Sequence, residues 1–115
     1  ENCRAKDGRI VRLAKKRHDD HILDEHPDLA RDFAYPASEI QKALESAEDV
    51  SPGSRPNTMM YLGPPVMPNG IASGGQFGHS REMRRFRVVV QTEEGNTGFV
   101  TTAYAPVVSA RGKVR

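Results

Sequence analysis

Histidine, hydroxyl and arginine side chains at three places in the chain have the chemistry to act on a phosphate ester. His21 lies in an acidic segment, and histidine carries protons near neutral pH because its ordinary pKa is about 6.5. Arg85 and Arg87 alternate along a predicted strand, so both guanidiniums face one side and each can bind two phosphate oxygens. Thr102 and Tyr104 alternate in the same way. These residues indicate proton transfer beside a bound phosphodiester.

Each of these groups also has a structural explanation, and the residue types alone do not decide between the two. A histidine on a helix is commonly structural. Charged residues such as those at 84–87 protect an edge strand from pairing with other chains. Thr101 is expected on the face opposite Thr102 and Tyr104. All three are residue types that are common in strands without any function.

Metal binding is a different use of the histidines. His18 and His21 are three residues apart and would share a face of a helix, whereas His21 and His26, five apart, would not. No third ligand follows at a suitable spacing. The single cysteine, Cys3, excludes an internal disulfide and a cysteine-based zinc site. We therefore expect no metal and no other cofactor.

A glycine-rich segment, residues 71–79, provides further candidates for substrate contacts. Its glycines and His79 suit a flap over a substrate, or simply a flexible loop. It lacks the Lys-Ser/Thr pair of a phosphate-binding loop and the strand-to-helix context of a dinucleotide site. We include His79, Arg84 and Thr101 as candidate substrate contacts.

The first half of the chain is predicted to position His21 on helices. One helix is expected to begin at Asp19 or Asp20, which are good N-cap residue types, and Pro27 is expected at the first position of a second, with His26 at the joint. Residues 9–13 fit either a short strand or a helix start. Ser38 and Gln41 have capping-box spacing, which predicts a further helix that fades before residue 51 and buries Ile40, Ala43, Leu44 and Ala47.

The second half is predicted to form strands. Strands are expected at Met59–Leu62, at 84–92 and at 98–106, where Pro106 ends the last one, with a tight turn at EEGNTG between the last two. Residues 63–80 are predicted to be one long loop. The expected fold is α+β, with N-terminal helices packed on a small antiparallel sheet of about four strands.

Length and composition limit the class of protein. The 115 residues allow one domain, spanning 1–115, with 1–8 and 107–115 expected as flexible ends. No apolar run approaches the length of about 20 residues that a membrane-spanning helix needs, and the N-terminus lacks the apolar core of a signal peptide. Because the chain lacks a starting Met, we expect a module of a longer protein.

The small net charge of +2 hides a division along the chain. Residues 1–17 carry seven Lys or Arg and two acidic side chains, residues 18–50 carry two and ten, and residues 51–115 carry eight and three. Either these charges lie on solvated faces, or the two basic blocks meet and form a surface that binds a polyanion.

The order of the short motifs resembles the barnase–EndoU–colicin–RelE superfamily of ribonucleases, in particular its phage-associated and polymorphic-toxin branches. The resemblance covers roughly residues 9–106 and rests on the order of the motifs rather than on any one string. One position departs from it, because Glu25 precedes His26 where the family often has a basic residue. The motifs are His21, Ile22, His26 and Pro27; Ile40, Ala43 and Leu44; Tyr61 and Leu62; Arg87 to Val90; and Thr102, Ala103 and Tyr104.

The resemblance implies a metal-independent endoribonuclease toxin that cleaves RNA, with tRNA as one candidate substrate. His21 would be the acid/base, with His26 as a second candidate, and Thr102 and Tyr104 would be active-site hydroxyl residues. Arg85 or Arg87 would supply the cation. Such toxins, including those of contact-dependent growth inhibition, are secreted or delivered as part of a larger bacterial protein. They act in the target-cell cytoplasm, and a cognate immunity protein neutralises them.

Two other classes of function stay open. A non-catalytic nucleic-acid-binding or ribosome-binding module would use the same basic blocks and would produce no new RNA ends. A catalytically silent interaction domain of a phage or secretion protein would not poison cells.

Overall fold

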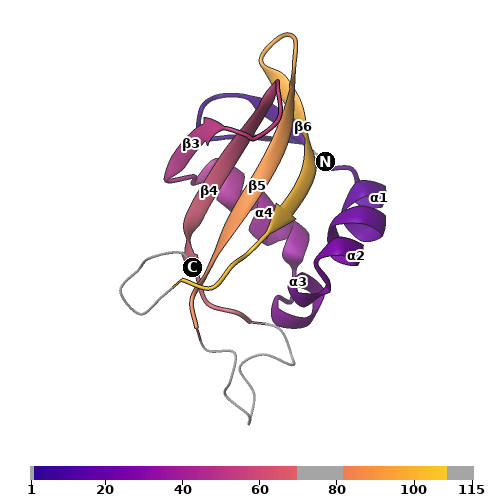
Figure 1. Ribbon diagram of the computed structural model, residues 1–115, viewed down its shortest axis with the longest axis vertical. Coiled ribbons are helices and arrows are strands. Elements are labelled where there is room, and N and C mark those ends of the chain that lie inside the picture. The colour runs from indigo at the N-terminus through magenta and orange to yellow at the C-terminus, as the bar shows by residue number, and fades with distance from the viewer. Residues whose placement is uncertain (1, 70–81, 109–115) are drawn as a thin grey trace.

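The structure, a computed structural model, describes residues 2–69 and 82–108. Six strands form one sheet in the order β1-β2-β6-β5-β4-β3 (Figure 1). Every neighbouring pair is antiparallel except β2 and β6, which are parallel. The strands are β1 (Asn2–Arg4), β2 (Ile10–Arg12), β3 (Asp49–Pro52), β4 (Thr58–Val66), β5 (Arg84–Glu93) and β6 (Thr97–Tyr104). The α+β class is confirmed, but the sheet has two strands more than the expected four and one parallel pairing.

Helices cover one face of the sheet and flank its strand β6. A continuous helical segment consists of α1 (Lys15–Arg17), a π-helical turn η1 (His18–Ile22) and α2 (Leu23–Glu25). It is followed by α3 (Pro27–Asp32) and α4 (Pro36–Glu45). Helix α4 crosses the sheet and packs on β4 and β5, whereas η1 packs against β6 (Figure 1). The other face of the sheet is left without a covering helix in the described part of the chain.

The core lies between α4 and the sheet. Residues Ile40, Ala43, Leu44 and Ala47 are all buried there, as their spacing predicted. Gly63 on β4 allows the helix to approach closely, because a Cβ atom at this position would lie 2.7 Å from the Cβ of Ala43. The opposing sheet residues are mostly β-branched or aromatic: Val11, Tyr61, Phe86, Val88, Val90 and Val100.

One of the predicted helix starts is confirmed and two are wrong. Pro27 is the first residue of α3 and follows His26, as expected. The first helical segment begins at Lys15 after an extended Ala14, so Asp19 and Asp20 lie inside it and do not cap it. Helix α4 begins at Pro36 rather than at the predicted capping box, because a proline at the first helical position needs no hydrogen-bond partner for its nitrogen.

The N-terminal residues are not the flexible end that we predicted. Asn2–Arg4 pair with β2, the Lys6 amide donates to the Leu44 carbonyl at 2.8 Å, and the Tyr61 hydroxyl donates to Asp7 Oδ2 at 2.8 Å. Burial, followed by the hydrogen bond to Asp7 and then by its negative charge, raises the pKa of Tyr61 to about 12. Long-range pairing therefore fixes a segment whose local sequence has no clear preference.

The predicted loop at 63–80 is also shorter than expected. β4 continues to Val66, with a shift of register between Leu62 and Pro65, and a bulge of this kind accommodates prolines that cannot donate to the ladder. β3 had no counterpart in the prediction. The turn between β5 and β6 is confirmed, with positive φ at Gly95 and Asn96. The rest of the predicted loop (70–80) and most of the predicted tail (109–115) lie outside the described residues.

Candidate functional site

The uncovered face of the sheet carries the alternate side chains of β5. Arg85 and Arg87 lie on this face, whereas Phe86, Val88 and Val90 are buried on the face toward α4. The predicted alternation along this strand is therefore confirmed. In the neighbouring strand β6, the side chains do not alternate regularly between the two faces.

A β-bulge in β6 decides which of its side chains share this face. Val100 pairs with Val90, and Thr102 pairs with Val89, so Thr101 is an extra residue without a partner in the ladder. Thr102 therefore lies beside Val89 on the uncovered face. Thr101, predicted for the opposite face, lines the same groove as Thr102, because a bulged residue leaves the regular alternation.

An open groove of about 590 Å³ lies on this face between the helical segment and the loop before β4. The groove brings His21 of η1 together with Thr102 and Tyr104 of β6. Its lining consists of Arg17, His21, Glu25, Ser54, Arg55, Thr58, Met60, Val89, Gln91, Thr101, Thr102 and Tyr104. The helical segment, the loop before β4 and strands β4, β5 and β6, which are distant in the sequence, thus meet in one hollow.

His21 is held by a carboxylate one helical turn away. Its Nε2 atom lies 3.2 Å from Oε1 of Glu25, and the two side chains are 41% and 51% exposed. This contact orients the imidazole ring and leaves Nδ1 as the nitrogen available for proton transfer. Glu25, the position that departs from the resembled family, is therefore a partner of His21.

His26 contributes to the site through Tyr104 and is not part of the groove lining. The two rings stack, with centroids 5.6 Å apart and planes at 30°. His26 also ends one helix and precedes the next, which fixes its position at the joint. His26 therefore fixes the position of the Tyr104 ring, and among the described histidines it is His21 that lines the groove.

The two threonines differ in their hydrogen bonds. Thr101 Oγ1 donates to the Val89 carbonyl at 3.2 Å. Thr102 Oγ1 is buried and has no hydrogen-bond partner among the described residues. A rotation of the Thr102 side chain is needed to bring this hydroxyl to the groove, where it can donate to a phosphate oxygen.

Of the three predicted arginines, Arg87 lies nearest to the groove. It lines an adjoining hollow of about 270 Å³ that shares Ser54 and Met60 with the groove, and its buried Nε has no partner within the described residues. Arg85 lies on the same face but donates from Nε to the Gly63 carbonyl at 2.9 Å and forms an ion pair with Glu48. The Arg85 guanidinium is thus occupied by contacts within the protein.

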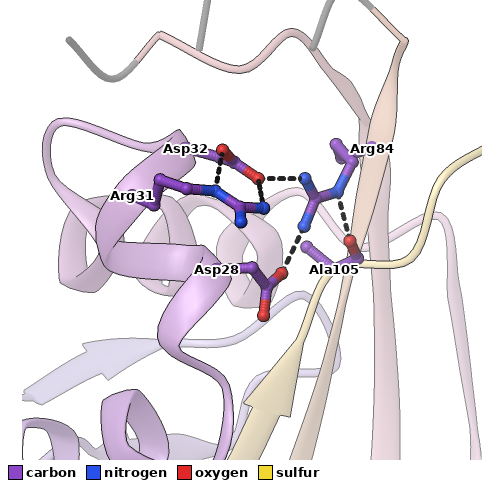
Figure 2. A network of polar contacts seen from close by, with 5 residues as sticks. All are labelled: Asp28, Arg31, Asp32, Arg84 and Ala105. Carbon is purple, nitrogen blue, oxygen red and sulfur yellow. Dashed lines mark hydrogen bonds and ion pairs between the residues drawn. The ribbon is translucent and has the colours of Figure 1, made fainter. Parts of the chain in front are cut away.

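Arg84 points to the other side of the sheet, which corrects its expected role in substrate binding. Figure 2 shows its guanidinium between α3 and the end of β6. Nη1 lies 2.7 Å from Asp32 Oδ2, Nη2 lies 2.5 Å from Asp28 Oδ2, and Nε donates to the Ala105 carbonyl. Arg84 is buried and fully paired, so its role is structural.

The groove contains cations that our sequence analysis missed. Arg17 stands on the helical wall and Arg55 on the opposite loop. The loop is held by the Thr58 hydroxyl, which donates to the Arg55 carbonyl at 2.6 Å, and by the Gln91 amide, which donates to the Asn57 carbonyl at 2.9 Å. The four-residue spacing of Arg17, His21 and Glu25 was a visible signal, whereas nothing local indicates Arg55.

If the groove binds RNA, as the sequence motifs led us to expect, removing the positive charge from both walls weakens that binding and its dependence on salt. In the variant Arg17→Gln/Arg55→Gln, the slope of log affinity against log salt falls by about 0.7 for each phosphate of a single strand that the protein no longer neutralises. Lys6→Gln/Lys42→Gln, which removes two positive charges from exposed lysines that do not line the groove, is the charge-matched control and leaves the slope unchanged. A fluorescence-anisotropy titration at several salt concentrations measures both variants. An unchanged slope in the double variant would exclude these guanidiniums as phosphate ligands.

The second histidine of the metal alternative does not face the groove. His18 is buried, with Nδ1 3.0 Å from Asp19 Oδ1, whereas His21 lines the groove. The predicted shared face is wrong because η1 has π-helical hydrogen bonding from residue i to i+5, which changes the angle between residues three apart. Across residues 2–69 and 82–108, no group of three or more His, Cys, Asp or Glu side chains is arranged to hold a metal ion. His79 lies outside the described residues.

Comparisons with known proteins give this chain no family, so its function is argued from the groove. The helices within the described ranges are too short or too polar to cross a membrane. The chain matches no family model, no curated protein and no solved structure.

Proposed function

We propose that this chain is a metal-independent endoribonuclease that cleaves RNA by attack of a ribose 2′-hydroxyl on the adjacent phosphate. The observation that supports this most is the groove that holds His21, paired with Glu25, together with Thr102, Tyr104 and cationic walls. A proton carrier, hydroxyl donors and guanidiniums are what this reaction needs, and none of its steps needs a metal.

The proposed step assigns a role to each of these groups. His21 removes the proton from the 2′-hydroxyl, whose oxygen then bonds to phosphorus while the bond from phosphorus to the 5′ oxygen breaks. Tyr104 gives a proton to the leaving 5′ oxygen, because its phenol is a stronger acid than the Ser and Thr hydroxyls that also line the groove. Arg17, Arg55 and the Thr102 hydroxyl stabilise the negative charge that develops on the phosphate oxygens. The products are a 2′,3′-cyclic phosphate and a free 5′-hydroxyl.

The proposal includes the biological setting that the resemblance implies. The domain would be a toxin module of a larger secreted or delivered bacterial protein, would act on RNA such as tRNA in the target-cell cytoplasm, and would be neutralised by a cognate immunity protein. The charged groove supports the RNA part of this setting.

Cleavage of RNA is expected to persist in EDTA and to leave cyclic phosphate ends. The purified chain is incubated with total RNA and a millimolar excess of EDTA, and the products are resolved on a denaturing gel. Treatment with acid, which opens a 2′,3′-cyclic phosphate, should shift the mobility of the 5′ fragments. Complete loss of cleavage in EDTA, or 5′-phosphate ends on the products, would contradict the proposed mechanism. Intact RNA under all conditions would favour a non-catalytic binding module.

A further inference from the structure

A second hollow adjoins the groove where β2 meets β6. It has a volume of about 300 Å³ and is lined by Arg12, Ala14, Arg17, Phe99 and Val100. Arg17 lines both this hollow and the groove, so the two are neighbours on the same face of the sheet. The reaction proposed above makes no use of Arg12 or Phe99.

Phe99 gives this hollow an aromatic ring with a cation beside it. In the sheet, Phe99 pairs with Arg12 of β2 and Gln91 of β5, and the guanidinium carbon of Arg12 lies 5.7 Å from the centre of the Phe99 ring. Arg12 also contacts Glu93 at 3.3 Å, but these two side chains are 58% and 42% exposed. An ion pair this exposed contributes little, so a phosphate can take the place of Glu93. An aromatic ring among guanidiniums is suited to an unpaired base and its phosphate.

The distance between the two aromatic residues of β6 indicates the kind of nucleic acid. Phe99 and Tyr104 lie on one face, opposite Gln91 and Arg87 of β5, so they are about 13 Å apart along the sheet. Neighbouring bases in a stacked strand are only about 3.4 Å apart. A strand can place a base on each ring when its bases are splayed out, as in single strands and loops, whereas the bases of a duplex stay stacked on one another.

We infer that the hollow beside Phe99 is a second nucleotide subsite of the groove, in which an unpaired base lies against Phe99 and its phosphate lies between Arg12 and Arg17. The inference rests on the proposed function, because the groove supplies the neighbouring site. It narrows the substrate to single-stranded or looped RNA.

The subsite is tested by binding an RNA that cannot be cleaved. A fluorescently labelled single-stranded oligonucleotide with 2′-O-methyl riboses lacks the attacking hydroxyl, and its affinity is measured by anisotropy. Phe99→Ala is expected to weaken binding about tenfold, whereas Phe99→Tyr, which keeps an aromatic ring, is expected to bind as tightly as the wild type. Arg12→Gln should reduce the salt dependence of binding, and a duplex of the same sequence should bind more weakly and equally to wild type and Phe99→Ala. Circular dichroism verifies folding. If Phe99→Ala does not fold, the salt dependence of binding by Arg12→Gln is the measurement that tests the subsite.

The outcomes separate this inference from the proposed function. Unchanged affinity in both Phe99→Ala and Arg12→Gln, or duplex binding as tight as that of the single strand, overturns the subsite. If binding depends on Phe99 but total RNA remains intact, the subsite stands and the ribonuclease proposal fails. If RNA is cut by wild type and Phe99→Ala with the same KM, the subsite fails and the ribonuclease proposal stands.

Discussion

Replacing His21 by alanine is expected to reduce the rate of RNA cleavage by about 10²- to 10⁴-fold, the usual contribution of a positioned general acid or base. The side chain is 41% exposed and packs into no core cluster, so its removal should leave the fold intact. Cleavage of a defined RNA under single-turnover conditions, with circular dichroism of both proteins, measures this effect. A pure variant that cleaves at the wild-type rate would remove His21 from the mechanism.

The matched control for this experiment is the neighbouring histidine. His26→Phe keeps an aromatic ring against Tyr104 and removes the imidazole, so we expect cleavage within a few fold of wild type. Glu25→Gln keeps a polar side chain of the same size beside His21 but removes the charge, and an intermediate loss is expected. A loss in His26→Phe as large as in His21→Ala would instead assign the proton transfer to His26.

Replacing Arg84 by methionine is expected to destabilise the domain by about 3 kcal/mol, the lower end of the cost of breaking a buried ion pair, because Asp32 loses its buried partner but keeps Arg31. Asp32, which is 1% exposed, then has the exposed Arg31 as its charged partner, while Asp28 is nearer the surface (Figure 2). Urea unfolding followed by circular dichroism measures the change in the free energy of unfolding. A midpoint equal to that of wild type would show that the network contributes nothing to stability.

Arg31 and acid titration provide the controls for this network. Arg31 also bonds Asp32, but its side chain is 62% exposed, so Arg31→Gln should cost much less stability than Arg84→Met. Hydrogen bonds from Arg31 and then from Arg84 hold the pKa of Asp32 below its ordinary value of 3.8. A lowered pKa in the folded state means that this stabilisation is complete above the ordinary pKa and is lost as the pH falls through the folded-state pKa. The Arg84 variant should therefore lose less stability on acidification than the wild type.

Local sequence patterns predicted those elements that depend on local interactions. Pro27 fixes a helix start through its own ring, and the alternation in 84–92 fixes which side chains are buried. The same alternation puts Arg84 on the side of Phe86, which was a sufficient signal against a role in substrate binding. The N-terminal hairpin and its parallel pairing with β6 could not be predicted, because both depend on contacts between distant segments.

The candidate site was predictable to a similar extent. His21, Thr102 and Tyr104 were selected by residue type, and the structure brings them together. Arg55 was missed because its place in the groove depends on the turn at Asn57, where φ is +58°. Arg17 and Arg55 come from the two basic blocks, so one residue of each block does meet the other across the groove, and Glu25 of the acidic block lies there as well. Which residues of the blocks meet is a property of the tertiary structure, and the division into blocks did not identify them.

The extra residue at Thr101 has a consequence for recognising related chains. Because it stands outside the ladder, its deletion would leave Val100 and Thr102 opposite the same partners, Val90 and Val89. In this chain Phe99 lies three positions before Thr102. In a relative without the bulge, the corresponding aromatic residue would lie only two positions before the corresponding threonine. A search pattern for this surface should therefore allow one optional position there, since a pattern of fixed length would align groove residues with core residues.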